Sequence, residues 1–367
     1  MKWLPEPWRD QLEYWGASRI IPQVHKLKVR KRLANTVAHA AETFDHSSWD
    51  AVLKTHVTTG GTLIDGKQII EDVSLVDYGG IANDSRFQRY LEQLSVAEID
   101  GLPPAEQLAL LLNAYNALCI CLIVQNYNAG ALRSIMDLST PQSKVWDLPA
   151  GRLGGKSVSL NHIEHQLLRA GWAEPDMHAC IVCASASCPN LATAAFTGER
   201  LAEQMHERMR QFCRNPTKGV HWTAEGRVLR LSRICLWFAN DFGGFRGAAE
   251  HAVAAVRDDA DPRYLPAQPD MQRASLRYFR YSWLLNAKKQ PEKLMTPPNN
   301  RAEYLRHIHD ALFLCCFYVY RYAPSAAILV FSEGMHSHRE EIDWRARGRP
   351  TLPWGYFPRP QIRCLVS

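Results

Sequence analysis

The longest apolar pattern in the chain lies at residues 104–127, where hydrophobic side chains occupy most faces of a predicted helix. A helix that is apolar on every side is buried in a protein core or in a membrane. Asn113 and Asn116 interrupt this run, so we expect a central buried helix and no membrane span. The two asparagines share one helix face. Because buried amides need hydrogen-bond partners, we expect them to hold a neighbouring loop rather than a substrate.

Shorter patterns surround this helix. Apolar periodicity predicts helices and extended pieces in alternation, together with a glycine turn at 60–61. The helices are expected at 48–54, 86–100, 199–213 and 246–257, and the strands or hairpins at 146–159, 178–183, 220–231 and 279–285. No regular βαβ period is present. We therefore expect an α+β fold, mainly helical, as a single domain at 46–288 with a small mixed or antiparallel sheet.

Two extensions flank the expected domain. Residues 1–45 are predicted to be a charged helical N-terminal extension, and 289–367 a linker with a poorly specified C-terminal extension. The apolar stretch 311–331 is long enough to cross a bilayer, but Arg321 and Pro324 interrupt it. No membrane span is expected there.

Composition limits the compartment and the partners. The net charge of +6 is only mildly basic, and the 10 cysteines are scattered without a compact even framework. The N-terminus also has no apolar core of a signal peptide. These features favour a reducing, cytoplasmic location. A solvated helix face explains the basic run at 26–32 better than nucleic acid does, so no nucleic-acid partner is expected.

The main candidate site is the segment 178–191, HACIVCASASCPNL. In the predicted strand, His178 and Cys183 face opposite sides because side chains alternate. Pro189 predicts a helix start, which places Cys188 at the N-cap beside free N–H groups and the positive end of the helix dipole. That setting lowers a thiol pKa. Packing explains Cys180 and Cys183 more simply than chemistry does.

A second candidate lies in the predicted helix LNHIEHQLLRA, which begins at Leu160. Asn161 and Glu164 have the spacing of a capping box, which gives Glu164 a structural explanation. His162 and His165 have the spacing of a metal pair, but no third ligand has a recognisable spacing. We therefore expect no metal at this helix.

Five ordered motifs resemble the domain of unknown function 547 family over residues 46–288. They are LLNAYNAL at 111–118, VSLNHIEHQLLR at 158–169, His178 with CASASCPNL, VLRLSRICLWFANDF at 228–242, and YSWLLN at 281–286. The resemblance implies no settled activity. Some members resemble fusions with glutaredoxin-like and other signalling modules, and plant relatives are called leucine-zipper ternary-complex-factor-like proteins. These associations imply thiol chemistry in one direction and scaffolding in the other.

Transferred residue by residue, the family pattern marks positions in three of the motifs. They are Asn113, Tyr115, Asn116, Glu164, His165, His178, Cys183, Ser187, Cys188 and Pro189. The chain departs from the pattern where three leucines at 110–112 replace an aromatic phrase. It departs again where Ser282 replaces an aspartate between Tyr281 and Trp283, which removes an acidic group from that motif.

Two classes of function follow. In the first, Cys188 is a nucleophile or redox thiol and His178 is its base or proton partner. Asn113 or Glu164 orients the histidine, and the chemistry is acyl transfer, hydrolysis or thiol–disulfide exchange. In the second, the same residues are packed core and the protein is an interaction or scaffold module.

Neither class requires a cofactor. Zinc binding by His178, Cys183 and Cys188 is a weaker interpretation because it supplies only three ligands, and structural sites use four. The partner is an unknown small molecule or protein, and a glutaredoxin-like module is a candidate. The distance between the Cys188 sulfur and the His178 ring discriminates among these hypotheses.

Overall fold

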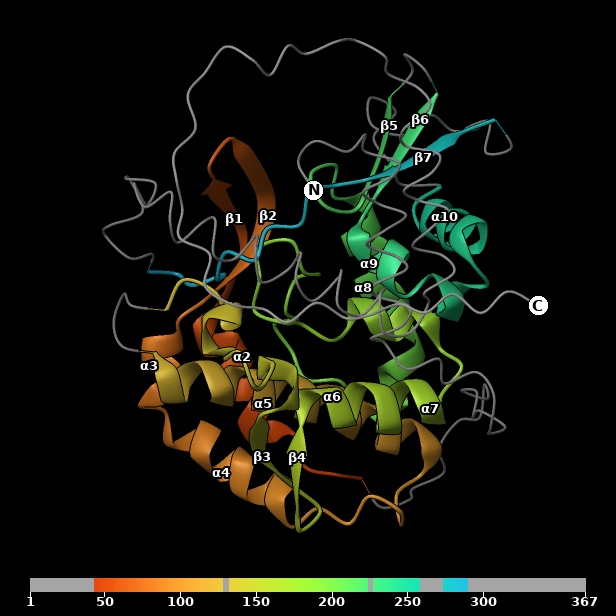
Figure 1. Cartoon of the computed structure of the whole chain (residues 1–367). Coiled ribbons are helices and arrows are strands. Elements are labelled where there is room, and N and C mark those ends of the chain that lie inside the picture. Colours follow the sequence, from red (N-terminus) through yellow and green to blue (C-terminus); the bar gives the residue numbers. More distant parts are fainter. Residues whose placement is uncertain (1–42, 128–131, 224–226, 258–272, 290–367) are drawn as a thin grey trace, which may run out of the picture. The chain divides into compact units, whose positions relative to one another are not determined.

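The computed structural model describes residues 43–127, 132–223, 227–257 and 273–289 (Figure 1). The predicted extensions at 1–45 and 289–367 lie almost entirely outside the described residues. The basic run at 26–32 and the apolar stretch at 311–331 also lie outside them. The described chain is a mainly helical α+β fold with sheets of two and three strands, as the pattern predicts.

Helix α5 (Pro104–Asn126) lies in the largest hydrophobic core, and nearly all of its residues are buried. Its neighbours include α3 (Tyr78–Ala82), α4 (Ser85–Ser95) and β3 (Pro149–Leu153). By length and composition alone α5 could cross a membrane, but 89% of its most apolar window is buried inside the protein. The same core contains Trp49 and Leu285, so the described chain has no division near residue 150.

The first part of the domain is a helix followed by a hairpin. Helix α2 (Ser47–His56) leads into β1 (Val57–Asp65), which pairs antiparallel with β2 (Gln68–Val76). The turn predicted at 60–61 is wrong, because both glycines lie inside β1 where the strand register shifts. A Cβ atom on Gly61 would lie 2.5 Å from the Leu75 side chain. Glycine serves a strand bulge here rather than a turn.

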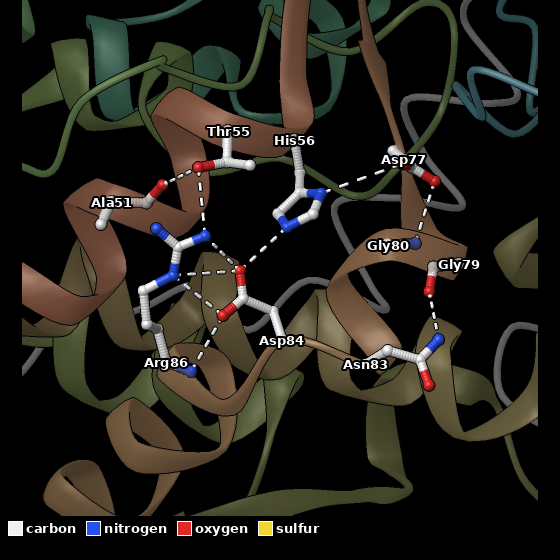
Figure 2. Close-up of polar contacts among 9 residues, drawn as sticks. All are labelled: Ala51, Thr55, His56, Asp77, Gly79, Gly80, Asn83, Asp84 and Arg86. Atoms are coloured by element: carbon white, nitrogen blue, oxygen red, sulfur yellow. Dashed lines mark hydrogen bonds and ion pairs between the residues drawn. The ribbon is translucent and has the colours of Figure 1, made fainter.

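Charged side chains fix the corner between α2, α3 and α4, as Figure 2 shows. His56 Nε2 lies 2.9 Å from Asp84 Oδ2, and the Arg86 guanidinium reaches the same carboxylate at 2.6 Å. Asp84 caps α4, and Asp77 caps α3 by accepting the Gly80 N–H. This corner anchors the end of β2 because Asp77 directly follows that strand.

A second hairpin and an irregular helix follow α5. Strands β3 and β4 (Lys156–Ser159) form the predicted hairpin. The next helix consists of α6 (Leu160–His162), a π-helical turn (Ile163–Leu168) and α7 (Arg169–Gly171). Its N-cap is Ser159, whose hydroxyl accepts the His162 N–H. The predicted capping box of Asn161 and Glu164 is therefore wrong, since an earlier side chain caps the helix.

The predicted strand at 178–183 is also wrong. Residues Pro175–Ala179 form a 3-10 helix, and 181–183 are irregular. Asn116 of α5 supplies the pairing that a neighbouring strand would have given. Its amide donates to Cys180 O at 2.8 Å and accepts the Val182 N–H at 2.9 Å. Both backbone groups are satisfied without a sheet.

No helix begins at Pro189. The chain instead continues without regular structure as far as a 3-10 turn (Gly198–Arg200) that precedes α8 (Leu201–Arg214). Asn113 of α5 holds this loop with both ends of its amide, which bind the backbone O and N of Phe196 at 2.8 and 3.0 Å. Cys188 is therefore not an N-cap. The expectation that the two asparagines hold a neighbouring loop is confirmed.

A second core forms around a three-stranded sheet. Strands β5 (Val220–Thr223) and β6 (Val228–Leu231) are the predicted hairpin, and β7 (Ser275–Tyr278) adds parallel to β6. Helices α9 (Arg233–Trp237) and α10 (Phe245–Ala254) contribute to the same core, and Ser232 caps α9. Three short 3-10 turns, Ile135–Leu138, Val145–Asp147 and Ala239–Phe242, complete the described elements.

The last strand is predicted at 279–285, but in the structure it lies earlier in the chain, as β7. The strand ends at Tyr278, and the chain then runs as an irregular segment from 279 to 287. Isolated bridges tie Leu285 to Ser185 and Ala287 to Val76. The segment therefore joins the loop after residue 183 to the end of β2, and this junction forms the candidate site.

Candidate functional site

The loop at 183–188 lies directly against the segment 281–286. Backbone hydrogen bonds join Ala186 N to Leu284 O at 2.8 Å and Asn286 N to Ala184 O at 3.0 Å. Ser187 adds two further contacts to Ser282, one from its backbone N–H and one in which its hydroxyl accepts the Ser282 N–H at 2.9 Å. Ser187, a predicted site residue, therefore joins the two segments by hydrogen bonds.

Ala184 adopts a left-handed backbone conformation with a φ of 59°. Residues other than glycine rarely occupy this region, and such strain persists only where surrounding contacts enforce it. The turn at Ala184 folds the loop back, so that the Cys183 N–H lies 3.2 Å from the Cys188 sulfur. Backbone strain in a buried loop beside two thiols marks this loop as a candidate functional element.

Four side chains form what we call the thiol cluster: Cys183, Ser185, Cys188 and Tyr281. The Tyr281 hydroxyl lies 3.1 Å from the Cys188 sulfur and 3.3 Å from the Cys183 sulfur. Ser185 donates its hydroxyl proton to Tyr281 at 3.0 Å. With its acceptor side occupied by Ser185, the Tyr281 hydroxyl points its own proton toward the sulfurs.

The two thiols of the cluster have opposite electrostatics. Burial raises the pKa of Cys188, but hydrogen bonds from Cys183, Ser185 and Tyr281 outweigh it and lower the pKa to about 6. Burial raises the pKa of Cys183 well above its ordinary value, and a neighbouring Cys188 thiolate raises it further. At neutral pH the cluster therefore holds one thiolate, at Cys188, and one thiol, at Cys183.

A carboxylic acid lies close to the cluster. The Tyr115 hydroxyl from α5 binds Glu164 Oε2 from the π-helical turn at 3.2 Å. Burial raises the pKa of Glu164 to about 7, and repulsion from the Cys188 thiolate contributes in the same direction. Glu164 can therefore hold or release a proton near neutral pH. The structure brings together Glu164, Tyr115, Cys183 and Cys188 of the predicted site residues.

His178 belongs to a different group of contacts. Its Nε2 lies 2.9 Å from Asp241 Oδ2, and the Arg169 Nε binds the same oxygen at 2.6 Å. Its ring stacks on Phe238 with 4.2 Å between centroids. Among the described residues no hydrogen bond joins His178 to Cys188. The described polar contact of this histidine goes to a buried carboxylate, and its pairing with the Cys188 thiol stays a prediction.

The remaining predicted residues are structural in this fold. His165 Nδ1 lies 2.9 Å from Arg169 Nη1, and burial together with that guanidinium lowers the pKa of His165 to about 3. In the described contacts, the Asn113 side chain binds the Phe196 backbone and makes no hydrogen bond to His178. Within the described ranges, no group of three or more histidine, cysteine, aspartate or glutamate side chains has the geometry to hold a metal ion.

Sequence reasoning missed three polar residues of the site, Tyr281, Ser185 and Asp241. All three lie inside the motifs that carry the family resemblance, at 281–286, 178–191 and 228–242. The signal that could have found them was a hydroxyl or carboxyl group embedded in an otherwise apolar phrase, since a buried polar group needs a specific partner.

Fold and site together define a mainly helical α+β domain in which a buried cysteine, Cys188, and a partly buried one, Cys183, both lie within hydrogen-bonding distance of the Tyr281 hydroxyl. Residues 99–213 match the family model described as Protein of unknown function, DUF547. The matched region lies inside the 46–288 inferred from the motifs and is shorter. No curated protein matches the chain, and no solved structure does.

Proposed function

We propose that the protein carries out thiol–disulfide exchange inside a reducing compartment, with Cys188 as the attacking thiolate and Cys183 as the resolving thiol. The observation that best supports this proposal is that both sulfurs contact the same Tyr281 hydroxyl, while the pKa values of the two thiols shift in opposite directions. An attacking thiol works best when its pKa lies near the ambient pH. A resolving thiol remains protonated until the first disulfide has formed.

The steps balance with an external disulfide as the co-reactant, either a small-molecule disulfide or one on a partner protein. The Cys188 thiolate attacks one sulfur of that disulfide, forms a mixed disulfide and releases a thiolate. Cys183 then loses its proton to the released thiolate and attacks the Cys188 sulfur. The products are a Cys183–Cys188 disulfide and the two reduced sulfurs of the co-reactant, one as a thiol and one as a thiolate that takes a proton from water, with the two electrons passed to the co-reactant.

The geometry supports this chemistry better than acyl transfer. The sulfur-to-sulfur separation cannot exceed the sum of the two distances to the Tyr281 oxygen, so the two sulfurs are close neighbours, as the resolving step requires. A Cys-His-Asn hydrolase needs an imidazole at the thiol. Here the imidazole of His178 is bound to Asp241 instead.

Equilibration with mixtures of reduced and oxidised glutathione tests the proposal. After acid quenching, peptide mass spectrometry should find a Cys183–Cys188 disulfide in the wild type and a glutathione mixed disulfide on Cys188 in Cys183→Ser. Cys188→Ser should give neither product. Cys213→Ser, which changes a buried cysteine of the second core, is the control and should behave as the wild type.

The second candidate is the interaction module, and the observation that favours it is the 3% exposure of Cys188. A thiol this buried reacts only if the loop or the segment 281–286 moves. Failure of Cys188 to form any disulfide while the folded protein remains intact would make the packed, non-catalytic interpretation the better one.

A further inference from the structure

Lys218 is a buried lysine beside the loop that carries the thiol cluster. It lies in the turn between α8 and β5, and 2% of its surface is exposed. Its backbone N–H binds Asn215 Oδ1, which fixes the turn. Lysine is almost never fully buried unless its charge is paired, so this position calls for a partner.

The partners that the ammonium group contacts are both neutral. Lys218 Nζ lies 2.8 Å from Asn190 Oδ1 and 3.4 Å from Ala186 O. The Asn190 amide is oriented for this role, because its Oδ1 also accepts the Ser74 N–H and its Nδ2 donates to Asp72 O. Within the part of the chain that the structure describes, no carboxylate lies within ion-pair distance of Lys218.

The two contacts of Lys218 bracket Cys188 in sequence. Ala186 stands two residues before the cysteine and Asn190 two residues after it. The ammonium group therefore holds the loop on both sides of the sulfur. Burial lowers the pKa of Lys218 to about 8, and attraction to Cys188 and Asp72 opposes that change. Lysine and cysteine can thus carry opposite charges in the same buried region at neutral pH.

We propose that Lys218 is a positioning residue for the thiol cluster. The buried positive charge of Lys218 balances the Cys188 thiolate, and its two hydrogen bonds fix the loop at Ala186 and Asn190. The inference rests on the proposed function. It assigns to Lys218 the cationic role that the sequence pattern had suggested for His178. A charge inside the protein interacts over several ångströms because the local dielectric is low, so direct contact is not required.

Other groups also face Cys188, and the test must separate them from Lys218. Hydrogen bonds reach the Cys188 sulfur from the Cys183 N–H and the Tyr281 hydroxyl, and the nearby Ser185 hydroxyl also lowers the pKa of Cys188. The remaining ionisable neighbours all have their pKa raised by burial and by a Cys188 thiolate: Tyr78, Tyr115, Cys119 and Glu164. Of the described ionisable groups that interact with Cys188, Lys218 is the one whose charged form the thiolate favours.

The experiment measures the pH midpoint of Cys188 ionisation from the ultraviolet absorbance of its thiolate, as the difference between each variant and the same variant with Cys188→Ser. Lys218→Met keeps the buried stem and removes the charge, and should raise the midpoint by about one to two pH units. Lys218→Arg keeps the positive charge, so its midpoint should stay close to that of the wild type. The exposed Lys67→Met is the control and should change nothing.

Asn190→Ala separates charge from positioning. This variant removes the contact between Lys218 and Asn190 but leaves the ammonium group in the interior. The pH midpoint of Cys188 ionisation should therefore rise less than it does in Lys218→Met. An equal rise in the two variants, or an unchanged midpoint in folded Lys218→Met, overturns the inference. The second result leaves the proposed function intact, whereas an ordinary midpoint in the wild type overturns both.

A second measurement applies if Lys218→Met does not fold. Coupling between two titrating sites is reciprocal, so loss of the thiolate must weaken proton binding at Lys218. In Cys188→Ser, the pH midpoint of the Lys218 side-chain carbon NMR signal should fall relative to the wild type. An identical midpoint in the two proteins overturns the inference.

Discussion

The Tyr281 hydroxyl lies 3.1 Å from the Cys188 sulfur and is the side-chain group through which the segment 281–286 reaches the thiol. The two residues are 93 positions apart in the chain. A hydrogen bond to a charged acceptor contributes about 1.5–3 kcal/mol. The contact is therefore strong enough to set the ionisation of Cys188.

Tyr281→Phe tests that contact. Loss of the hydroxyl should raise the pKa of Cys188 by about one unit or more, because the thiolate loses a donor while its burial persists. The ultraviolet thiolate signal, taken against Cys188→Ser, gives the pKa. Tyr127→Phe is a matched control, since the Tyr127 hydroxyl binds only the exposed Lys289 carbonyl in the described contacts. A Cys188 pKa that stays the same in Tyr281→Phe would contradict the assignment.

Asn116→Ala should destabilise the fold by about 3 kcal/mol. The substitution leaves Cys180 O and Val182 N buried without a partner, and each such group costs about 1–3 kcal/mol. Urea denaturation measures the free energy of unfolding. Asn126→Ala, near the exposed end of the same helix, also removes an amide contact and should cost less than about 1 kcal/mol. Equal losses in the two variants would show that the Asn116 amide has no special role.

The elements that the sequence predicts well are those with a long periodic pattern. Helices α5 and α8 and the hairpin β5–β6 follow directly from periodicity, because burial of one face or of all faces decides the structure. The prediction of a strand at 178–183 was wrong for a reason that hydrophobic periodicity does not contain. Its backbone is paired with the amide of Asn116, a residue more than 60 positions away.

The site shows the same limit. The sequence marked Cys188 as a candidate because of a predicted helix N-terminus, whereas in the structure no helix begins there and a hydrogen-bonded cluster lowers its pKa. Tyr281 and Lys218 approach the loop from distant parts of the chain, and no spacing rule connects them to it. Ser159 displaced the predicted cap at Asn161 because both residues are good caps two positions apart, and local pattern does not rank them.

The raised pKa of Glu164 predicts a fall in stability between about pH 4.5 and pH 7. Below this window both folded and unfolded states hold the proton. Within it the unfolded chain releases the proton while the folded protein keeps it, so the free energy of unfolding decreases as pH rises. The decrease should be about 2–3 kcal/mol. Denaturation curves at pH 4.5 and pH 7.5 should show it as the difference between the wild type and Glu164→Gln, because the lowered pKa of Cys188 contributes in the opposite direction above about pH 6 in both proteins. If the free energy of unfolding of Glu164→Gln depended on pH as steeply as that of the wild type, Glu164 would not be the source of the decrease.

His178→Ala separates the structural role of the histidine from the chemical one. The variant removes one partner of the buried Asp241 carboxylate, whose pKa is held low against burial by His178 and Arg169. Breaking such a buried pair costs about 3–5 kcal/mol. We therefore expect a large loss in the free energy of unfolding and no change in the pKa of Cys188, because in the described contacts His178 binds Asp241 and no hydrogen bond joins it to the thiol cluster.

The matched variant is Asp241→Asn, which weakens the same contacts from the other side and should give a similar loss of stability. His162→Ala, at an exposed position of the neighbouring helix, should be close to neutral. Denaturant unfolding and the thiolate absorbance are measured on each protein. A rise of a full unit in the Cys188 pKa of His178→Ala, with little loss of stability, would restore the histidine as the proton partner of Cys188. That result would place the acyl-transfer interpretation ahead of disulfide exchange, since an imidazole at the thiol is the feature which that chemistry requires.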